Sequence, residues 1–285
     1  MKGKEKSLWM KRITGAGRSI GHQALMTIIA ILIVMAFLAV SGYQPSAVMK
    51  GLGRAFTQDL AGTIRWATPL ILAGVAVCIP FKAQVFNLGV DGQIYLGAIA
   101  ATQVALMMPE NIGGLGLIPV FIAGAAAGAL FALIPALMKV YCNTDMVVTT
   151  LLLNFVGKLF TEFMTTEVMR DPGKVTQMNA SRTLPENLWL PKIAAFGSSS
   201  ASVGFYIAVI VALVAAFLFF KTTLGYEIKL VGTNPDFARY GGMKPNLVVL
   251  KVMALSGAVA GVIGTIEVTA VQHKLIDRKS TRLNS

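Results

Sequence analysis

The chain has 285 residues, of which 55% are hydrophobic and only 13% are charged, and its mean hydropathy is +0.68. Soluble domains carry roughly 25% charged residues, so this composition excludes an ordinary soluble domain and indicates an integral membrane protein. The net charge of +12 does not indicate nucleic-acid binding, because the positive residues lie at the ends of apolar runs and in loops. That placement is typical of membrane topology. Cys78 and Cys142 lie far apart, in or beside apolar runs, and do not indicate a disulfide framework.

The N-terminal part of the chain predicts one complete span and one incomplete span. Residues 1–23 are basic and polar, and the positive-inside rule places them in the cytoplasm. The apolar run Leu25–Val40 is the first predicted span. Residues 41–66 are mixed and amphipathic, as in a helix on the outer membrane surface. The next run, 67–80, is shorter than the roughly 20 residues that cross a bilayer, so we expect a broken or buried helix that continues to residue 83.

Five further apolar segments complete a predicted membrane domain over residues 24–277. They are residues 88–108, 115–138, 146–163, 203–220 and 247–271. The short loop 139–145 and the loop 221–244 then lie inside with the N-terminus, and the long polar loop 164–202 lies outside. The predicted fold class is therefore all-α, a polytopic transmembrane helical bundle of about seven spans.

Residues 81–97 carry polar groups between two apolar runs. An ionised carboxylate at the bilayer centre costs roughly 2.5–3.5 kcal/mol, so Asn87, Asp91 and Gln93 should face protein or a water-filled path. If the stretch is helical, Asn87, Asp91 and Tyr95 share one face at i, i+4 spacing. Amide side chains offer both donors and acceptors, which suits neutral ligands that carry hydroxyl groups.

Two further polar side chains lie within predicted spans. Asn154 belongs to residues 146–163, and Glu267 is the lone carboxylate of residues 247–271. Either could line a path, but Gln93 and Asn154 could instead make hydrogen bonds between helices, and Glu267 could be a packing carboxylate. The glycines that predict close approach of helices are Gly124, Gly128, Gly257, Gly261 and Gly264.

The inside loop 221–244 contains the signals of one short helix, near residues 234–241. Asn234 can cap it, Pro235 suits its first turn, and Arg239 lies near its end. Gly241 can stop it. A short helix between two spans either docks another protein or is an ordinary connecting turn, and the pattern alone does not decide between them.

Four ordered motifs resemble the permeases of ABC importers in the branched-chain amino acid, ribose and nucleoside superfamily. Residues 85–93 (VFNLGVDGQ) are similar to the FNIGxEGQ segment of the simple-sugar and nucleoside branch, with Asp91 in place of the usual Glu. Residues 149–154 (TTLLLN) resemble its TTLMLN, and residues 255–267 resemble LSGALAGLAGAIE. Residues 230–242 (LVGTNPDFARYGG) resemble the coupling segment, with Phe237 where alanine is usual. The resemblance runs from residue 69 to residue 277.

The resemblance implies a permease subunit in the bacterial plasma (inner) membrane, with its N-terminus in the cytoplasm, for nucleosides or simple sugars. It also implies three protein partners: a separate ABC ATPase subunit, a second permease subunit and an extracytoplasmic substrate-binding protein. Membrane lipid is the fourth implied partner, because the spans lie in the bilayer. No Walker A sequence is present, so ATP should bind the partner and not this chain. The implied pathway residues are Asn87, Asp91, Gln93, Asn154 and Glu267. The implied contacts with the ATPase are Asn234, Pro235, Phe237, Arg239, Tyr240 and Gly241.

Two other functions compete with this interpretation. An ion-coupled secondary transporter of small polar solutes would use an intramembrane carboxylate such as Asp91 or Glu267. A membrane enzyme would need a catalytic or metal-binding constellation, and the only histidines, His22 and His273, lie near predicted membrane ends without such spacing. We therefore expect no catalytic site, no metal and no cofactor on this chain. A branched-chain amino acid substrate is not separated from nucleosides and sugars by the sequence.

The end of the chain departs from the family pattern. Relatives continue past the position of Asp277 with a glycine-rich segment and further spans, whereas residues 278–285 here are a polar tail. This departure predicts a C-terminally truncated permease with a foreign tail, which would insert into the membrane without transporting.

Overall fold

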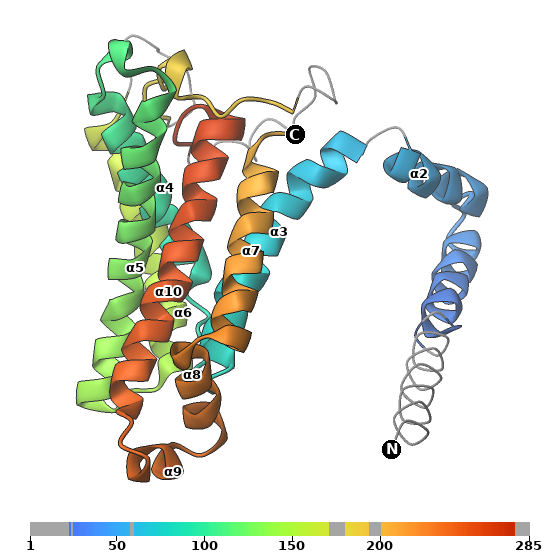
Figure 1. The fold of residues 1–285 in the computed structure, drawn as a ribbon. Helices are drawn as coiled ribbons and strands as arrows, with labels where there is room; N and C mark the ends of the chain where they lie inside the picture. The colour runs from blue at the N-terminus through green and yellow to red at the C-terminus, as the bar shows by residue number, and fades with distance from the viewer. Residues whose placement is uncertain (1–22, 24, 58–59, 171–179, 194–200, 277–285) are drawn as a thin grey trace, which may run out of the picture. The chain divides into compact units, whose positions relative to one another are not determined.

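The computed structural model describes residues 23, 25–57, 60–170, 180–193 and 201–276 (Figure 1). It divides into two compact units, Met1–Leu60 and Ala61–Ser285. In the first unit the apolar helix Leu25–Val40 precedes α2, Pro45–Thr57. A helix was expected within residues 41–66, and α2 confirms it. Most of the basic N-terminus and the whole tail 278–285 lie outside the described residues.

The second unit is helical throughout its regular structure, with no strand among the described residues, which confirms the all-α class. The α-helices are α3 (Leu60–Phe81), α4 (Val90–Met107), α5 (Leu117–Cys142), α6 (Met146–Phe163), α7 (Gly204–Lys221), α8 (Thr223–Thr233), α9 (Pro235–Tyr240) and α10 (Pro245–Ile266). Short 3-10 helices are η1 (Glu110–Gly116) and η3 (Glu186–Leu188), and π-helical turns are η2 (Met164–Val168) and η5 (Glu267–Gln272).

The helices that could cross a membrane differ from the predicted spans in number and in bounds. Five described helices are long and apolar enough: Leu60–Phe81, Ile112–Cys142, Met146–Val168, Gly204–Lys221 and Pro245–Gln272. Helix Leu25–Val40 is shorter, and α4 opens with Asp91 and Gln93, so neither is among the five. The expectation of an incomplete helix at 67–80 was wrong. The helix α3 begins at Leu60 and keeps Pro69 within it, which gives it 22 residues.

Helix α10 is the centre of the bundle, because glycines let it touch two neighbours at the level of the backbone. Half of its most apolar window is buried, against 11 to 28% in the other four spanning candidates. A Cβ atom at Gly261 would collide with backbone atoms of Gly124 on α5, and a Cβ at Gly97 on α4 would collide with Gly261. Gly128 and Gly257 meet in the same way. The predicted close packing of these glycines is confirmed.

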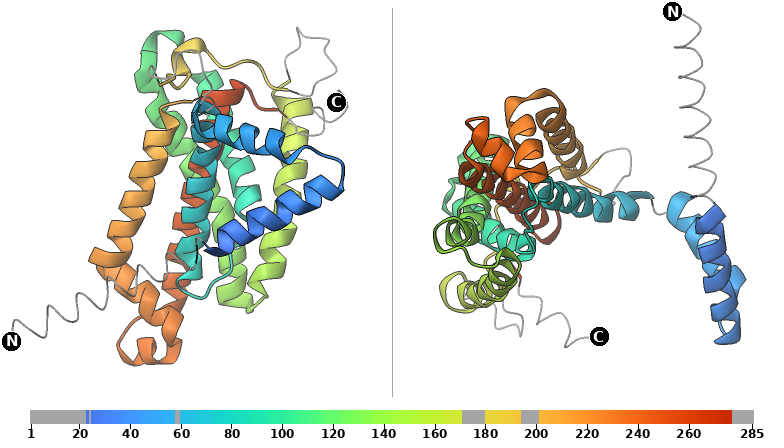
Figure 2. Two further views of the ribbon diagram at one scale, coloured as in Figure 1. Left: turned by 90° about the vertical axis from the view of Figure 1, so that its right-hand side faces the viewer. Right: turned by 90° about the horizontal axis from the view of Figure 1, so that it is seen from below.

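The two ends of the bundle carry different structures (Figures 1 and 2). One end holds α8 and α9, and six cationic residues belong to elements that end or begin there: Lys82, Lys139, Lys221, Lys229, Arg239 and Lys244. The opposite end is covered by residues 180–193, here called the cap. The cap lies in the predicted polar loop 164–202, yet its Leu184 and Leu188 are buried against the bundle.

Candidate functional site

The connection between α3 and α4 is the most polar part of the described bundle, and it is not helical. Helix α3 ends at Phe81, the chain turns over residues 82–84, and residues 85–89 have no regular secondary structure before α4 begins at Val90. Gln84 lies in the left-handed region with φ of 57°. The prediction that Asn87 shares a helical face with Asp91 and Tyr95 was therefore wrong. Irregular backbone at membrane depth must find its hydrogen bonds within the protein.

Asn87 supplies many of those hydrogen bonds from a fully buried position. Its Nδ2 donates to Oε1 of Gln93 at 3.1 Å and to Oγ of Ser256 at 2.8 Å. Its Oδ1 accepts from Nε2 of Gln93 at 3.1 Å and from the backbone N–H of Gly89 at 3.0 Å. Ser256 in turn donates to the carbonyl of Ala76 on α3 at 2.6 Å. The amide of Asn87 thus joins α4 and α10, and Ser256 extends this network to α3.

Helix α6 holds the same connection from another side. Asn154 accepts from the backbone N–H of Gly92 at 2.8 Å and donates to the carbonyl of Leu88 at 2.7 Å. Thr150 Oγ1 lies 3.3 Å from the N–H of Leu88 and can accept from it. A Cβ at Gly92 would lie only 3.1 Å from Asn154 Oδ1. Gly92 therefore lets α4 approach α6 closely. At this short distance the side chain of Asn154 can bond the backbone of Leu88 and Gly92.

The two predicted pathway carboxylates differ from the amides in exposure. Asp91 is exposed in the first turn of α4, where the helix dipole favours a negative charge. Glu267 opens η5 and forms an ion pair of 3.8 Å with Arg65 of α3. Arg65 also lies 4.4 Å from the centroid of the Trp66 ring. Glu267 is the only carboxylate of residues 247–271, as the sequence shows, and Arg65 is its partner. Residues 41–66 were predicted to form a helix on the outer membrane surface, whereas Arg65 belongs to α3, a helix long enough to cross a membrane.

The structure brings three of the five predicted pathway residues together through hydrogen bonds. Asn87, Gln93 and Asn154 all form hydrogen bonds with groups of residues 87–93. A fourth, Asp91, lies within the same stretch. Glu267 does not join them. It follows Ser256 by eleven positions on α10 and η5, which at 1.5 Å per residue is about 16 Å along the axis. Sequence reasoning missed Ser256, although it lies in the quoted motif at 255–267, because a serine in an apolar span gives no signal of its own.

At the end of the bundle next to Glu267 the cap contacts η5 and its C-cap residue, His273. The ring of Trp189 stacks on His273 with centroids 3.9 Å apart, and the backbone N–H of Leu184 donates to the carbonyl of His273. His273 has φ of 54° and ends η5. Burial lowers the pKa of His273 below 6.5, and the charge of Lys192 lowers it further, while a hydrogen bond with the backbone of Thr269 acts in the opposite direction.

The predicted coupling residues all lie on or beside α9, at the other end. Asn234 caps it by accepting from the N–H groups of Asp236 and Phe237 at 3.1 and 3.0 Å, and Pro235 occupies its first turn. The helix is anchored by Ala238, which is fully buried, whereas Phe237 is 60% and Tyr240 92% exposed. Arg239 forms an exposed pair of 3.0 Å with Asp236, and Gly241 follows as the C-cap. The predicted short helix is confirmed.

The comparisons with known proteins agree with this architecture. The family model described as "Branched-chain amino acid transport system / permease component" matches residues 60–283. The nucleoside ABC transporter permease protein NupB of Lactococcus lactis is 32% identical, over 84% of this chain and 66% of its own length. The glucose ABC transporter permease protein TsgB13 of Haloferax volcanii is also 32% identical, over 86% and 68%.

A third relative, the guanosine ABC transporter permease protein NupP of Bacillus subtilis, is 30% identical over 85% of this chain and 71% of its own length. The chain thus spans about two thirds of the length of the curated relatives it matches. No solved structure gives a significant match. The family match covers most of the chain, and this chain therefore belongs to the family of branched-chain amino acid transport system permease components.

Proposed function

We propose that this chain is a permease subunit of an ATP-driven importer and forms part of the path for nucleosides or simple sugars. The relatives named above, which are nucleoside, guanosine and glucose permeases, support this substrate class. The observation that carries the proposal is α9, a capped helix that presents exposed Phe237 and Tyr240 between two membrane-crossing candidates. Large exposed aromatic side chains on a short, anchored helix favour docking of a protein partner.

The proposed partner at α9 is an ABC ATPase subunit, which binds and hydrolyses ATP. Arg239 and its neighbours then transmit movement of the ATPase to α10, which begins four residues after Gly241. A second permease subunit and an extracytoplasmic substrate-binding protein complete the importer. We assign the catalytic groups and the bound ATP to the ATPase subunit, and the part of this chain that the structure describes holds no cluster of His, Cys, Asp or Glu that could bind a metal ion.

The proposed path places the five polar residues in two roles. Asp91 and Glu267 are accessible carboxylates, which can accept hydrogen bonds from the hydroxyl groups of a sugar or ribose. Asn87, Gln93 and Asn154 border the path by holding the irregular α3–α4 connection in one arrangement. Because the donors and acceptors of these amides are paired within the protein, we assign them the shape of the path and assign contact with the hydroxyl groups of the ligand to the two carboxylates.

The proposed location is the bacterial plasma membrane, with the N-terminus and α9 on the cytoplasmic side. Six cationic residues belong to elements at the α9 end and lie in or next to short connections, which supports a cytoplasmic side under the positive-inside rule. The cap end carries cations of its own, Arg170, Arg182 and Lys192 among them, so the support comes from the short connections and not from a difference in number. The cap then faces the outside, where a substrate-binding protein would deliver its ligand.

Co-purification with the ATPase subunit tests the role of α9. We expect Arg239→Glu combined with Tyr240→Ala to reduce recovery of the ATPase at least about tenfold, because both side chains are exposed and make no contact that holds the bundle. The matched control is Lys221→Glu, which reverses an exposed charge at the same end of the bundle but outside α9. Equal recovery from the double variant and the control would remove α9 from the interface.

Uptake by the reconstituted complex tests the energy source and separates the importer from an ion-coupled transporter. In a reconstituted complex that takes up nucleoside, the uptake should stop on depletion of ATP and continue in the presence of a protonophore at fixed ATP. Coupling through Asp91 or Glu267 to an ion gradient predicts the opposite pattern.

A further inference from the structure

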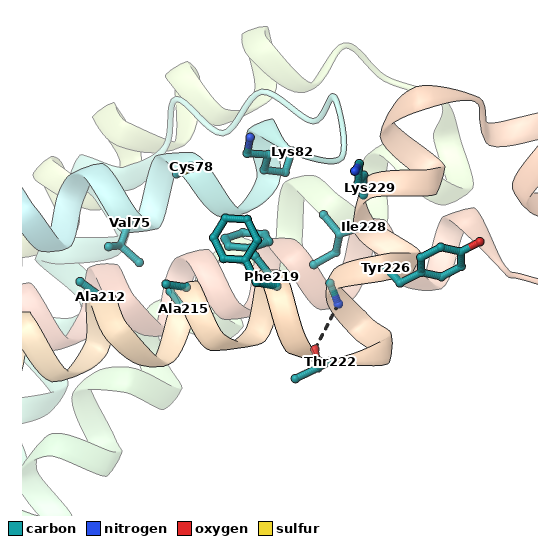
Figure 3. A pocket seen from close by; sticks show the side chains of 13 residues that line it. Val75, Cys78, Lys82, Ala212, Ala215, Phe219, Thr222, Tyr226, Ile228 and Lys229 are labelled. Atoms are coloured by element: carbon teal, nitrogen blue, oxygen red, sulfur yellow. Dashed lines mark hydrogen bonds between the residues drawn. The ribbon is translucent and has the colours of Figure 1, made fainter. Parts of the chain in front are cut away.

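A pocket of about 600 Å³ lies between α3, α7 and α8, and it is bordered by Lys82, the first residue of the α3–α4 connection (Figure 3). Its walls are apolar: Val75 and Cys78 on α3 face Ala212, Ala215 and Phe219 on α7. The small side chains of the two alanines leave the space that forms the pocket. Other, larger side chains of α7, such as Leu213 and Phe217, point away from it, and more than half of their surface is exposed. Both α3 and α7 are membrane-crossing candidates, so the pocket opens on a surface that lipid covers.

Two lysines border this pocket at its α8 end. Lys82 follows the last residue of α3, and Lys229 lies on α8. They are brought together because α8 lies against the turn after α3: a Cβ atom at Gly232 would collide with the carbonyl oxygen of Lys82. The tight return of α8 onto α7 depends on Gly225, because a Cβ atom there would collide with the carbonyl oxygens of Leu218 and Phe219. Figure 3 shows both amino groups on the same side of the pocket, beyond the ring of Phe219.

The two ammonium groups have no acidic partner among the described residues. The carboxylate on α8, Glu227, is 3.4 Å from Lys251 of α10 and is occupied by that pair. Lys82 and Lys229 are both exposed, and the ion pairs within the described bundle involve neither. Two like charges on adjoining elements repel each other unless an anion lies between them. An anion with an apolar body would satisfy both the lysines and the alanine-lined walls.

We propose that this pocket binds an anionic phospholipid, with its phosphate on Lys82 and Lys229 and an acyl chain along Ala212 and Ala215. Basic pockets between transmembrane helices bind anionic headgroups in this way, and each lysine near a membrane surface contributes to the attraction. An apolar wall at membrane depth favours a lipid over a free phosphate compound, which would leave that wall unfilled. The site goes beyond the proposed transport function, because it uses none of the pathway residues and none of α9.

Lipid binding to the purified protein, measured by native mass spectrometry with phosphatidylglycerol and phosphatidylcholine, tests the proposal. We expect the double variant Lys82→Gln/Lys229→Gln to bind phosphatidylglycerol about 10- to 30-fold more weakly and phosphatidylcholine unchanged. The matched control, Lys139→Gln/Lys221→Gln, removes two charges at the same end of the bundle that do not border the pocket. It should keep the wild-type affinity. Equal loss in both double variants would overturn the site.

A second pair of variants tests the acyl-chain wall without changing any charge. Ala215→Phe should fill the pocket and weaken phosphatidylglycerol binding at least about fivefold, whereas Val214→Phe, on the exposed face of α7, should not. Glycerol phosphate alone supplies the anion without the chain and should not compete at concentrations that saturate the lipid. Competition by glycerol phosphate, or unaltered lipid binding by Ala215→Phe, would show that the pocket is not a lipid site.

Discussion

Asn87 and Gln93 exchange two hydrogen bonds of 3.1 Å through their side-chain amides, across the start of α4. Both side chains are at most 1% exposed. A buried amide pair of this kind fixes the irregular residues 85–89 in one arrangement, because any other arrangement would leave polar groups unpaired away from water. The pair therefore makes a distinct prediction about stability.

Asn87→Ala should lower the stability of the bundle by about 1–3 kcal/mol for each polar group it leaves unsatisfied. Those groups are the amide of Gln93 and the backbone N–H of Gly89. Thermal unfolding in one detergent is the measurement, with the exposed Asn246→Ala as the control. The double variant Asn87→Ala/Gln93→Ala should lose less than the sum of the single losses. Strict additivity would mean that the two amides act independently.

Gly97→Ala should destabilise the bundle by about 1–3 kcal/mol or more, because its new methyl group would overlap the backbone of Gly261 and force α4 from α10. The control is Gly74→Ala on α3, where a Cβ atom meets nothing within 4 Å. That change should stabilise α3 by up to about 1 kcal/mol. Melting temperatures that shift in the same direction would contradict the packing described for Gly97.

Asn234→Ala should loosen α9 by about 1 kcal/mol, because two backbone N–H groups lose their acceptor. If α9 docks the ATPase, recovery of the ATPase should fall even though Phe237 and Tyr240 are still present. Asn234→Ser keeps a capping oxygen and should restore recovery. Undiminished recovery with the alanine variant would show that the order of α9 does not matter for docking.

The contact between the cap and His273 should weaken in acid. The pKa of His273 in the folded protein lies below 6.5, so the unfolded chain binds a proton that the folded chain does not. Its contribution to stability is therefore complete above pH 6.5 and is lost as the pH falls toward the lowered pKa. Amide hydrogen exchange of residues 184–190 should rise at pH 5.5, after correction for intrinsic rates, more than exchange in α5.

His273→Asn is the matched variant for this pH dependence. Asparagine tolerates the left-handed backbone at this position and does not titrate. The acid-induced rise in exchange should disappear in it. A rise of the same size in both proteins would assign the effect to another group.

The proposed topology predicts the side from which Cys142 reacts. Cys142 ends α5 at the α9 end of the bundle and is exposed. In a Cys78→Ser background, a membrane-impermeant thiol reagent should label Cys142 only after the cells are opened. Labelling of intact cells would reverse the orientation of the whole bundle.

The sequence predicted those parts of the structure that depend on local signals. Asn234 and Pro235 begin α9 because capping and a fixed φ act within a few residues. Gly128 and Gly257 were likewise expected at a packing surface, and they meet there. The irregular form of residues 85–89 was not predicted, because the bonds that stabilise it come from Asn154 and Ser256 on helices distant in the sequence.

The position of Arg65 was also not predictable from local sequence. A cation beside an apolar run usually indicates the end of a membrane span. Here Arg65 lies within α3, where it forms an ion pair with Glu267, a residue far away in the sequence. The cap was predicted only as a polar loop, because single leucines between polar residues give no periodic pattern.

The backbone contacts of α10 have a mechanical consequence. Where glycines of α4, α5 and α10 touch, no side chain lies between the helices to change rotamer and absorb a displacement. If the proposed ATPase pushes on α9, the push passes through residues 241–244 into α10, and α4 and α5 must then travel with it as one stiff block. Helix α3 is tied to that block by the bond of Ser256 to the carbonyl of Ala76, so relative motion is left to α7, which meets its neighbours through apolar side chains such as Ala208.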